Sequence, residues 1–363
     1  MSPISSLALA CGGILLSLLP ARPAPAHPDL LAVERCFFVM GTTCQATAFA
    51  GSRSSGLGTL EEAFSELKRF DRMLSDYDPD SELSSLNAWP AGAARPCSAE
   101  LFEILAQAQV LSQRTAGAFD PGIGALSSAW DLRGRGRIPS PGALAQARAG
   151  SGMTQLKLER AGQTAIKTHP RLQLDPGAFG KGAALERAAK VLRARGTASA
   201  LLDFGGQILA LGAPPNASGW RVGIAHPRDR SRPVAWLALR EISAATSGQG
   251  ERHLAVGGRT LGHILDPRSG VPVPAYGSVT VITPSSFDAD ALATALYVMG
   301  PAAGLAWAAR HADLEALYLV QEGERLRARG SPGIEAYLEA VDPQVVIMDR
   351  PLAHHSERKP SCW

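Results

Sequence analysis

Apolar residues recur at helical spacing in four stretches of the chain. In the first stretch, Leu60, Ala63, Phe64 and Leu67 fall at positions i, i+3, i+4 and i+7, and charged residues occupy the other faces. The spacing recurs three more times beside residues that start or stop helices. The pattern predicts helices over 59–74, from after Ser98 to near Gly117, over 181–195 ahead of Gly196, and from near Asp288 through DADALATALYVMG.

Other stretches are rich in β-branched and aromatic residues and are bounded by glycine, proline or asparagine, as is typical of strands. Residues 36–50 form the first predicted strand, and 51–58 and 132–142 are predicted loops. Further strands are predicted over 157–169, 199–206, 220–227, 234–246 and 276–284. Because helices and strands are mixed without a strict β-α-β rhythm, the expected fold class is α+β with mixed sheets and flanking helices.

The composition is that of a globular protein. Of the 363 residues, 45% are hydrophobic and 19% are charged, which excludes a wholly disordered chain. The length suits one large domain or two. The 36 Lys and Arg residues against 33 Asp and Glu leave a net charge of +3, and the basic residues are scattered, so no nucleic-acid partner is expected. Any anionic ligand should therefore be small and bound locally.

The two ends of the chain differ from the rest. Residues 4–20 are apolar and uncharged, and Ala24 and Ala26 follow in the A-x-A pattern of a cleavage site. We expect residues 1–26 to be a signal peptide and the mature protein to be exported and periplasmic. An uncleaved inner-membrane anchor and a lipid attached at Cys11 are the alternatives that would hold it on a membrane. The polar segment 344–363 is expected to be a loose C-terminal tail.

Several common catalytic motifs are missing. The sequence has no G-x-S-x-G, no G-x-x-x-x-G-K-[ST], no H-E-x-x-H and no G-x-G-x-x-G after a predicted strand. These absences argue against a hydrolase elbow, a P-loop and a zinc protease. The five cysteines include no C-x-x-C pair, so a structural zinc site is not expected, and disulfide pairing stays open.

Asp290 and Thr294 are candidate metal ligands. A spacing of four residues places both side chains on one face of the last predicted helix, where their oxygens could bind one hard cation. Oxygen ligands with a single carboxylate suit Mg²⁺, which completes its shell with water and substrate phosphates. The alternative is that Asp290 interacts favourably with the helix dipole and Thr294 is solvated.

Lys181 is a candidate phosphate ligand. It lies among Gly177, Gly180 and Gly182 immediately before a predicted helix. Exposed backbone N–H groups, a helix N-terminus and a lysine together favour phosphate binding. A glycine-rich turn with a solvated lysine explains the same residues.

Other polar and aromatic residues lie at predicted turns. His263 lies in an apolar, strand-like stretch, where a neutral imidazole could act as a general base or have a structural role. Tyr77 lies in a turn, and Phe119 and Asp120 lie between glycines. A flat ligand could stack at these turns, although ordinary turn packing is the alternative.

Eight segments, taken in order over about residues 37–296, resemble the FAD:protein FMN transferase family, also called ApbE. They are FFVMGTT, LSDYDPDSELSSLN, GAFDPGIGALSSAW, LDPGAFGKG, LLDFGGQILALG, ATSGQGER, GHILDPRSGVPV and ADALATAL. The resemblance implies an ApbE-like domain over 30–343 with mainly antiparallel sheets. It also implies transfer of the FMN half of FAD to a Thr or Ser hydroxyl of an acceptor flavoprotein, with release of AMP and a requirement for Mg²⁺.

The same resemblance assigns roles to individual residues. Asp290 and Thr294 would hold Mg²⁺ together with the backbone carbonyl of Ala178. Lys181 would neutralise pyrophosphate charge, and His263 would activate the acceptor hydroxyl. The residues implied to line the FAD cleft are Met40, Tyr77, Ala118, Phe119, Asp120, Asp175, Lys181 and Ile264.

The sequence departs from the family pattern at four positions. Gln249 and Gly250 stand where an acidic residue and a tyrosine are usual, so a polar or stacking contact is expected to be absent. Pro176 replaces an aliphatic residue, and Ala293 stands where some members have a further Asp, so the metal site would have fewer carboxylates.

Three functions fit these features. The first is the transferase, and the second is hydrolysis of FAD to FMN and AMP, which uses water as the acceptor. The third is storage of FAD without turnover. Storage needs no base, so the presence of His263 favours catalysis.

Overall fold

In the computed structural model, residues 30–249, 253–256 and 259–347 are described. They contain a nine-stranded sheet in the order β1-β2-β6-β7-β10-β15-β16-β17-β19. Neighbouring strands are antiparallel except for β17 and β19, which are parallel. The strands are β1 Leu31–Val39, β2 Thr42–Ala50, β6 Ala200–Phe204, β7 Gln207–Leu211, β10 Ile242–Gly248, β15 Gly277–Thr283, β16 Glu315–Glu322, β17 Arg325–Gly330 and β19 Val345–Ile347. The expected α+β class with mainly antiparallel sheets is confirmed.

Residues 36–50, predicted as one strand, belong to a hairpin. β1 and β2 pair in register from Leu31 opposite Ala50 to Val39 opposite Thr42. Met40 and Gly41 form the turn with φ of 49° and 70°. Two consecutive residues with positive φ make the tight turn that matches the twist of a hairpin. The single-strand prediction was wrong because the Met-Gly pair gives little sign of a turn in an otherwise continuous β-forming stretch.

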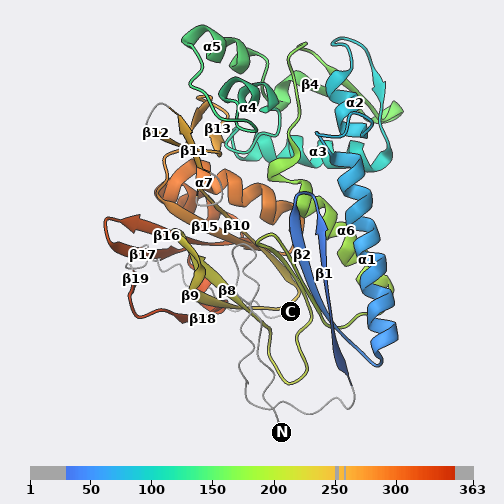
Figure 1. The fold of residues 1–363 in the computed structure, drawn as a ribbon, viewed down its shortest axis with the longest axis vertical. Helices are drawn as coiled ribbons and strands as arrows, with labels where there is room; N and C mark the ends of the chain where they lie inside the picture. Colours follow the sequence, from blue (N-terminus) through green and yellow to red (C-terminus); the bar gives the residue numbers. More distant parts are fainter. Residues whose placement is uncertain (1–29, 250–252, 257–258, 348–363) are drawn as a thin grey trace, which may run out of the picture.

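Three long helices cover one face of this sheet (Figure 1). They are α1 Arg53–Leu74, α6 Gly180–Ala194 and α7 Ser286–Ala308. Their buried side chains and those of the sheet form the larger hydrophobic core, which includes Leu67, Leu185 and Leu296. The helices predicted at 59–74, 181–195 and from 288 onward are confirmed, with α7 longer than expected.

The predicted loop at 51–58 was also wrong, because α1 begins at Arg53. The Ser52 hydroxyl caps the helix by accepting a hydrogen bond from the Ser55 N–H at 3.2 Å. Gly56 is buried against β1, where a Cβ would lie 2.7 Å from Val33 Cγ2. The glycine therefore permits close helix–sheet packing rather than forming a linker.

A smaller three-stranded sheet covers the opposite face of the large sheet. It has the order β18-β9-β8, with β8 Trp220–His226, β9 Asp229–Leu239 and β18 Leu338–Val341. A second core lies between the two sheets and includes Trp220, Leu237 and Ile208. The predicted strand 234–246 is in fact the end of β9 and the start of β10, because Glu241 with φ of 50° turns the chain between them.

The segment between α1 and α6 forms a group of smaller elements at one end of the molecule (Figure 1). It contains α2 Glu82–Ala88, α3 Ala99–Arg114, α4 Gly124–Trp130 and α5 Pro141–Ala149, the short sheet β3-β5-β4 and the turn η3 Pro176–Ala178. The small strands are β3 Arg95–Pro96, β4 Leu156–Glu159 and β5 Thr164–Lys167. Helix α3 with its Ser98 cap is confirmed, whereas α2, α4 and α5 were not predicted.

Two small hairpins lie between β10 and β15. They pair β11 His253–Val256 with β12 Arg259–Gly262, and β13 Leu265–Asp266 with β14 Val271–Pro272. Helix α7 follows β15 and packs on the sheet. It is long and apolar enough to cross a membrane by composition, but it is a core helix here, with a kink at Gly300 before Pro301.

Candidate active site between the starts of helices α6 and α7

The first turn of α6 lies directly against α7. The Gly182 N–H donates a hydrogen bond to Asp290 Oδ2 at 2.9 Å, and Lys181 Nζ lies 3.7 Å from Asp290 Oδ1. A Cβ at Gly182 would lie 2.8 Å from Phe287 Cα, so only glycine allows this approach. The structure thus brings together the lysine and the carboxylate that sequence analysis selected separately, at a helix N-terminus that favours anions.

Asp290 and Thr294 share a face of α7, as the spacing predicted. Asp290 is 6% exposed. The Thr294 hydroxyl lies 3.5 Å from the Ser247 hydroxyl of β10. Ala178 belongs to η3, which contacts both α6 and α7. The three residues therefore lie on the elements that meet at this helix junction.

This donor set fits a magnesium ion. Carboxylate, hydroxyl and carbonyl oxygens are the hard ligands that Mg²⁺ takes. No group of three or more His, Cys, Asp or Glu side chains suited to a metal occurs in the described part of the chain. A cation at this junction would therefore rest on one carboxylate, Asp290, and on neutral oxygens.

Asp175 and Tyr77 meet at a residue that sequence analysis did not select, Arg133. The Arg133 guanidinium pairs with Asp76 and, at 3.1 Å, with Asp175 Oδ2. Its central carbon lies 4.9 Å from the centre of the Tyr77 ring. Tyr77 itself is 73% exposed. Arg133 thus joins the turn after α1 to the segment that leads into η3.

The Asp175 carboxylate affects the neighbouring Asp76 carboxylate. Burial and then the neighbouring Asp175 carboxylate raise the pKa of Asp76, while Arg133 acts in the opposite direction. Asp175 also accepts a hydrogen bond from the Gly177 N–H at 2.9 Å, which shapes the turn before Lys181. We call Asp76, Tyr77, Arg133 and Asp175 the arginine cluster.

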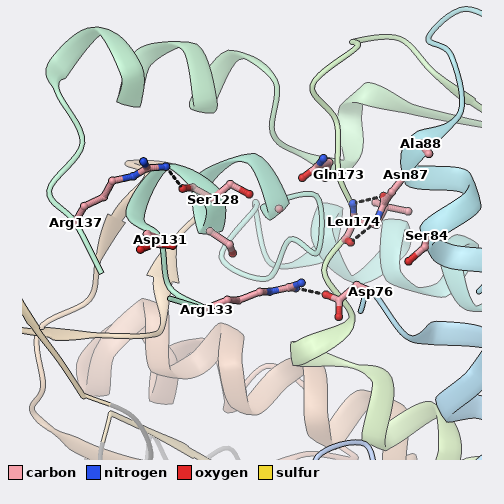
Figure 2. Close-up of a pocket in the computed structure, with 12 residues that line it drawn as sticks. Asp76, Ser84, Asn87, Ala88, Ser128, Asp131, Arg133, Arg137, Gln173 and Leu174 are labelled. Carbon is pink, nitrogen blue, oxygen red and sulfur yellow. Dashed lines mark hydrogen bonds and ion pairs between the residues drawn. The ribbon is translucent and has the colours of Figure 1, made fainter. Parts of the chain in front are cut away.

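A cavity of about 530 Å³ lies beside the arginine cluster (Figure 2). Arg133 reaches across it toward Asp76, and Asn87 joins its wall to the segment before Asp175. The Asn87 amide accepts from the Leu174 N–H at 2.7 Å and donates to the Leu174 carbonyl at 2.9 Å. The lining residues are Asp76, Ser84, Asn87, Ala88, Gly124, Ser127, Ser128, Asp131, Arg133, Arg137, Gln173 and Leu174.

The segment 118–120 is largely buried. Ala118 is fully buried and Phe119 is 1% exposed, so the Phe119 ring offers no surface for stacking. The Asp120 carboxylate accepts hydrogen bonds from the Gly122 N–H at 2.8 Å, the Met153 N–H at 2.9 Å and the Ser112 hydroxyl at 2.9 Å. Burial raises the pKa of Asp120, against the effect of these bonds. In this arrangement Asp120 shapes its loop.

Met40 lies beside the turn between β6 and β7. A Cβ at Gly205 would lie 2.8 Å from the Thr42 side chain, so the two turns touch. Burial raises the pKa of Asp203, which precedes this turn, to about 6, while Arg230 and Lys181 act to lower it. Asp203 is therefore a further carboxylate within electrostatic range of Lys181 that the sequence analysis did not select.

His263 and Ile264 lie between β12 and β13, in a bend rather than the expected strand. His263 is half-buried and Ile264 is buried. Gln249, expected to mark a missing contact, is completely buried, and its side chain hydrogen-bonds both backbone polar groups of Ile264. The neighbouring Gly250 lies outside the described residues.

Three of the five cysteines lie among the described residues. Among the described residues, Cys36, Cys44 and Cys97 are free thiols. The other two cysteines, Cys11 and Cys362, lie outside the described residues. So do the predicted signal peptide and most of the predicted tail.

An α+β protein with a lysine in the first turn of one helix, next to a buried carboxylate of a second helix, has a site suited to a phosphate-bearing ligand and a cation. Comparison with known proteins identifies the family within this class of proteins. Residues 40–318 match the model of the ApbE family. The FAD:protein FMN transferase of Treponema pallidum is 32% identical over 332 residues, which cover 86% of this chain and 91% of that protein. This chain therefore belongs to the ApbE family.

Solved structures agree with this assignment. The apo form of the flavinyl transferase ApbE from Pseudomonas stutzeri is similar with a TM-score of 0.76 and 31% identity, over 86% of this chain and 98% of that one. The flavin transferase ApbE from Vibrio cholerae is similar with a TM-score of 0.75 and 28% identity, over 85% of this chain and 100% of that one.

Proposed function

We propose that this chain is a magnesium-dependent FAD:protein FMN transferase that attaches FMN to a Thr or Ser hydroxyl of an acceptor flavoprotein and releases AMP. Its curated relatives carry that transferase name, and membership of their family makes the chain a transferase enzyme. The observation that carries the finer proposal is the junction of Lys181, Gly182 and Asp290, because it joins a cation, a helix N-terminus and a buried carboxylate at one point.

The reaction replaces the phosphoanhydride bond of FAD with a phosphoester bond to the acceptor. The acceptor hydroxyl oxygen forms a bond to the phosphorus of the FMN half, and the bond from that phosphorus to the bridging pyrophosphate oxygen breaks. AMP leaves with the bridging oxygen. Such transfers depend mainly on positioning and on neutralising charge.

The residues of the junction between α6 and α7 would supply both positioning and charge neutralisation. Lys181 would face the pyrophosphate, where its positive charge would offset the negative charge that develops on the leaving AMP. Asp290, Thr294 and the Ala178 carbonyl would hold Mg²⁺. When bound, that ion supplies Lewis-acid stabilisation of charge on the phosphoryl oxygens.

His263 would accept the proton of the acceptor hydroxyl. A hydroxyl is a weak nucleophile, and an imidazole is a side chain suited to remove its proton near neutral pH. The half-buried position of His263 leaves part of the residue accessible to an incoming protein segment.

FAD would extend from the junction toward the arginine cluster. Asp175 and Tyr77 are both in this cluster, and Tyr77 offers an exposed ring for a flat group. The backbone of 118–120, together with Met40 and Ile264, would complete the cleft, with Phe119 contributing no ring stacking.

Export is proposed on the sequence alone. The signal peptide over 1–26 would deliver the mature chain to the periplasm, where its acceptor flavoprotein would also be found. Cleavage at Ala26 would give a protein without a membrane tether, whereas an uncleaved segment or a lipid at Cys11 would keep it on the inner membrane.

Mass spectrometry tests the proposal directly. The purified mature chain is incubated with FAD, Mg²⁺ and a periplasmic flavoprotein domain that carries an acceptor Thr. The expected result is an acceptor mass increased by FMN minus water, which is lost with a chelator or when the acceptor Thr is changed to Val. Free FMN and AMP with an unmodified acceptor would favour hydrolysis instead, and intact bound FAD with no product would favour storage.

A further inference from the structure

Gln249 lies at the end of β10 and its side chain is fully buried against the loop that carries His263. The side-chain oxygen accepts a hydrogen bond from the Ile264 N–H at 3.2 Å. The side-chain nitrogen donates to the Ile264 carbonyl at 3.2 Å and to the Val273 carbonyl at 3.0 Å. One side chain therefore binds both backbone polar groups of the residue that follows His263.

The residue before His263 is held by the same side chain. A Cβ at Gly262 would overlap the Gln249 amide group, so the amide lies flat against the backbone at that point. Val273 closes the arrangement from the other side, because its N–H donates to the Ile264 carbonyl at 2.9 Å. Both chain neighbours of His263 are thus in contact with Gln249.

The chemistry of the amide suits this position. A glutamine side chain has one oxygen acceptor and an NH₂ group with two donors, and here it has a partner for each. A carboxylate of the same size can only accept, so it could not donate to either carbonyl. Buried backbone groups without a partner cost about 1–3 kcal/mol each, which makes the amide specifically suited to this site.

We propose that Gln249 is a positioning residue that fixes the backbone on both sides of His263 and thereby sets where the imidazole meets the acceptor hydroxyl. This inference rests on the proposed function of His263. Gln249 would then have a role of its own, whereas the family pattern alone shows only that the usual acidic residue is absent at this position.

The test compares two substitutions at Gln249 with the same substitutions at Gln109. Gln109 is a matched control because its side-chain nitrogen also donates to two backbone carbonyls, those of Met153 at 3.2 Å and Leu156 at 2.8 Å, away from His263. Gln249→Met removes every hydrogen bond of the amide, and Gln249→Glu removes only its donors. FAD affinity, the rate of FMN transfer and amide hydrogen exchange are measured on the full mature chain.

We expect Gln249→Met to lower the maximal transfer rate about 100-fold, the cost of a small misplacement of a reacting group. The loss of FAD affinity should be smaller, because Ile264 is only one of the residues proposed to line the cleft. The Ile264 N–H should exchange at least about tenfold faster in Gln249→Met than in the wild type. Gln109→Met should leave the rate and the Ile264 exchange unchanged. An unchanged transfer rate in Gln249→Met, or an equal loss of FAD affinity and rate, would overturn the inference.

Gln249→Glu provides a second test that can be used if Gln249→Met does not fold. Burial raises the pKa of a carboxyl group, and the protonated form regains one donor. The transfer rate of Gln249→Glu relative to the wild type should therefore rise as the pH falls from 8 to 6, whereas Gln109→Glu should show a flat ratio. A flat ratio for Gln249→Glu would count against the inference.

Different results would contradict the proposed function and the positioning role of Gln249. If the wild type transfers no FMN to any acceptor, the proposed function fails. The Ile264 exchange rates still decide whether Gln249 holds this backbone, because they need neither acceptor nor turnover.

Discussion

At the scale of single residues, Asp290 has two tasks that a substitution can separate. One oxygen accepts the Gly182 N–H, and the other lies near Lys181. An asparagine can keep the first contact while losing the negative charge, so it tests the charge without removing the helix junction.

We expect Asp290→Asn to reduce Mg²⁺-dependent FMN transfer at least about 100-fold and to leave cooperative unfolding intact, because the side-chain oxygen still accepts from Gly182. Transfer rates over a Mg²⁺ titration provide the measurement. Asp288→Asn is the control, since Asp288 is on the same helix and pairs with Gln107 instead. Equal activity of Asp290→Asn and the wild type would show that Asp290 is not a ligand of the proposed magnesium site.

Asp203 makes folding stability depend on pH. Its folded pKa is raised to about 6 from 3.8, so between these values the folded state binds more protons than the unfolded state. The free energy of unfolding therefore falls as the pH rises from about 4 to 6. Above pH 6 the full cost of the buried charge remains, on the order of 2–3 kcal/mol.

Asp203→Asn should remove this cost while keeping an oxygen that can accept from the Gly206 N–H. We expect the variant to be more stable than the wild type at pH 7 by about 1–3 kcal/mol, with the difference shrinking toward pH 4. Urea unfolding at pH 4, 5.5 and 7 measures it. A difference that does not change with pH would show that Asp203 does not titrate in this range.

At the scale of elements, the amphipathic helices were predictable and the short elements were not. The i, i+3, i+4, i+7 pattern and the Ser98 cap located α3 because local signals and burial agree there. Helices α2 and α4 have only seven residues each, too few for a period to be recognised. The turn at Met40 was missed because its conformation is set by hairpin closure rather than by a turn-forming pair such as Asn-Gly.

The junction of α6 and α7 depends on Gly182. Gly182→Ala should destabilise the protein by about 1–3 kcal/mol and lower transfer activity, because the added methyl group collides with the α7 backbone at Phe287 and pushes Lys181 away from Asp290. Thermal unfolding and transfer assays measure both effects. Gly142→Ala in α5 is the control, since nothing lies within 4 Å of a Cβ there. A fully active, equally stable Gly182→Ala would show that the contact is adaptable.

At the scale of the whole molecule, the candidate site is assembled from distant parts of the chain. Lys181 and Asp290 could be selected from sequence because each lies in a distinctive local pattern. Arg133 could not, since it lies in a predicted loop and its partners Asp76 and Asp175 come from two other segments. From the sequence, Gln249 could be recognised only as a departure from the family pattern. Its contacts could not be predicted, because they depend on a loop that folds back onto it.

Arg133 should support FAD binding by holding Tyr77 and Asp175 in place. We expect Arg133→Met to weaken FAD affinity about five- to tenfold, which corresponds to about 1 kcal/mol or one lost hydrogen bond, with little change in thermal stability because the pair is partly exposed. Calorimetric titration with FAD measures it. Arg137→Met is the control from the same cavity, since Arg137 donates to the carbonyls of Ser128 and Ala129. Affinity unchanged or increased in Arg133→Met would argue against this role.

The pairing of β2 with β6 joins Ala48 directly to Ala200 and closes a very long loop. The entropic cost of closing a loop rises only slowly with its length, so lengthening an exposed connection within this segment should cost the sheet little stability. The rate of folding is more sensitive, because contacts between distant residues form late. The arginine cluster lies within that segment, so its assembly depends on contacts between distant parts of the chain, which are slow to form.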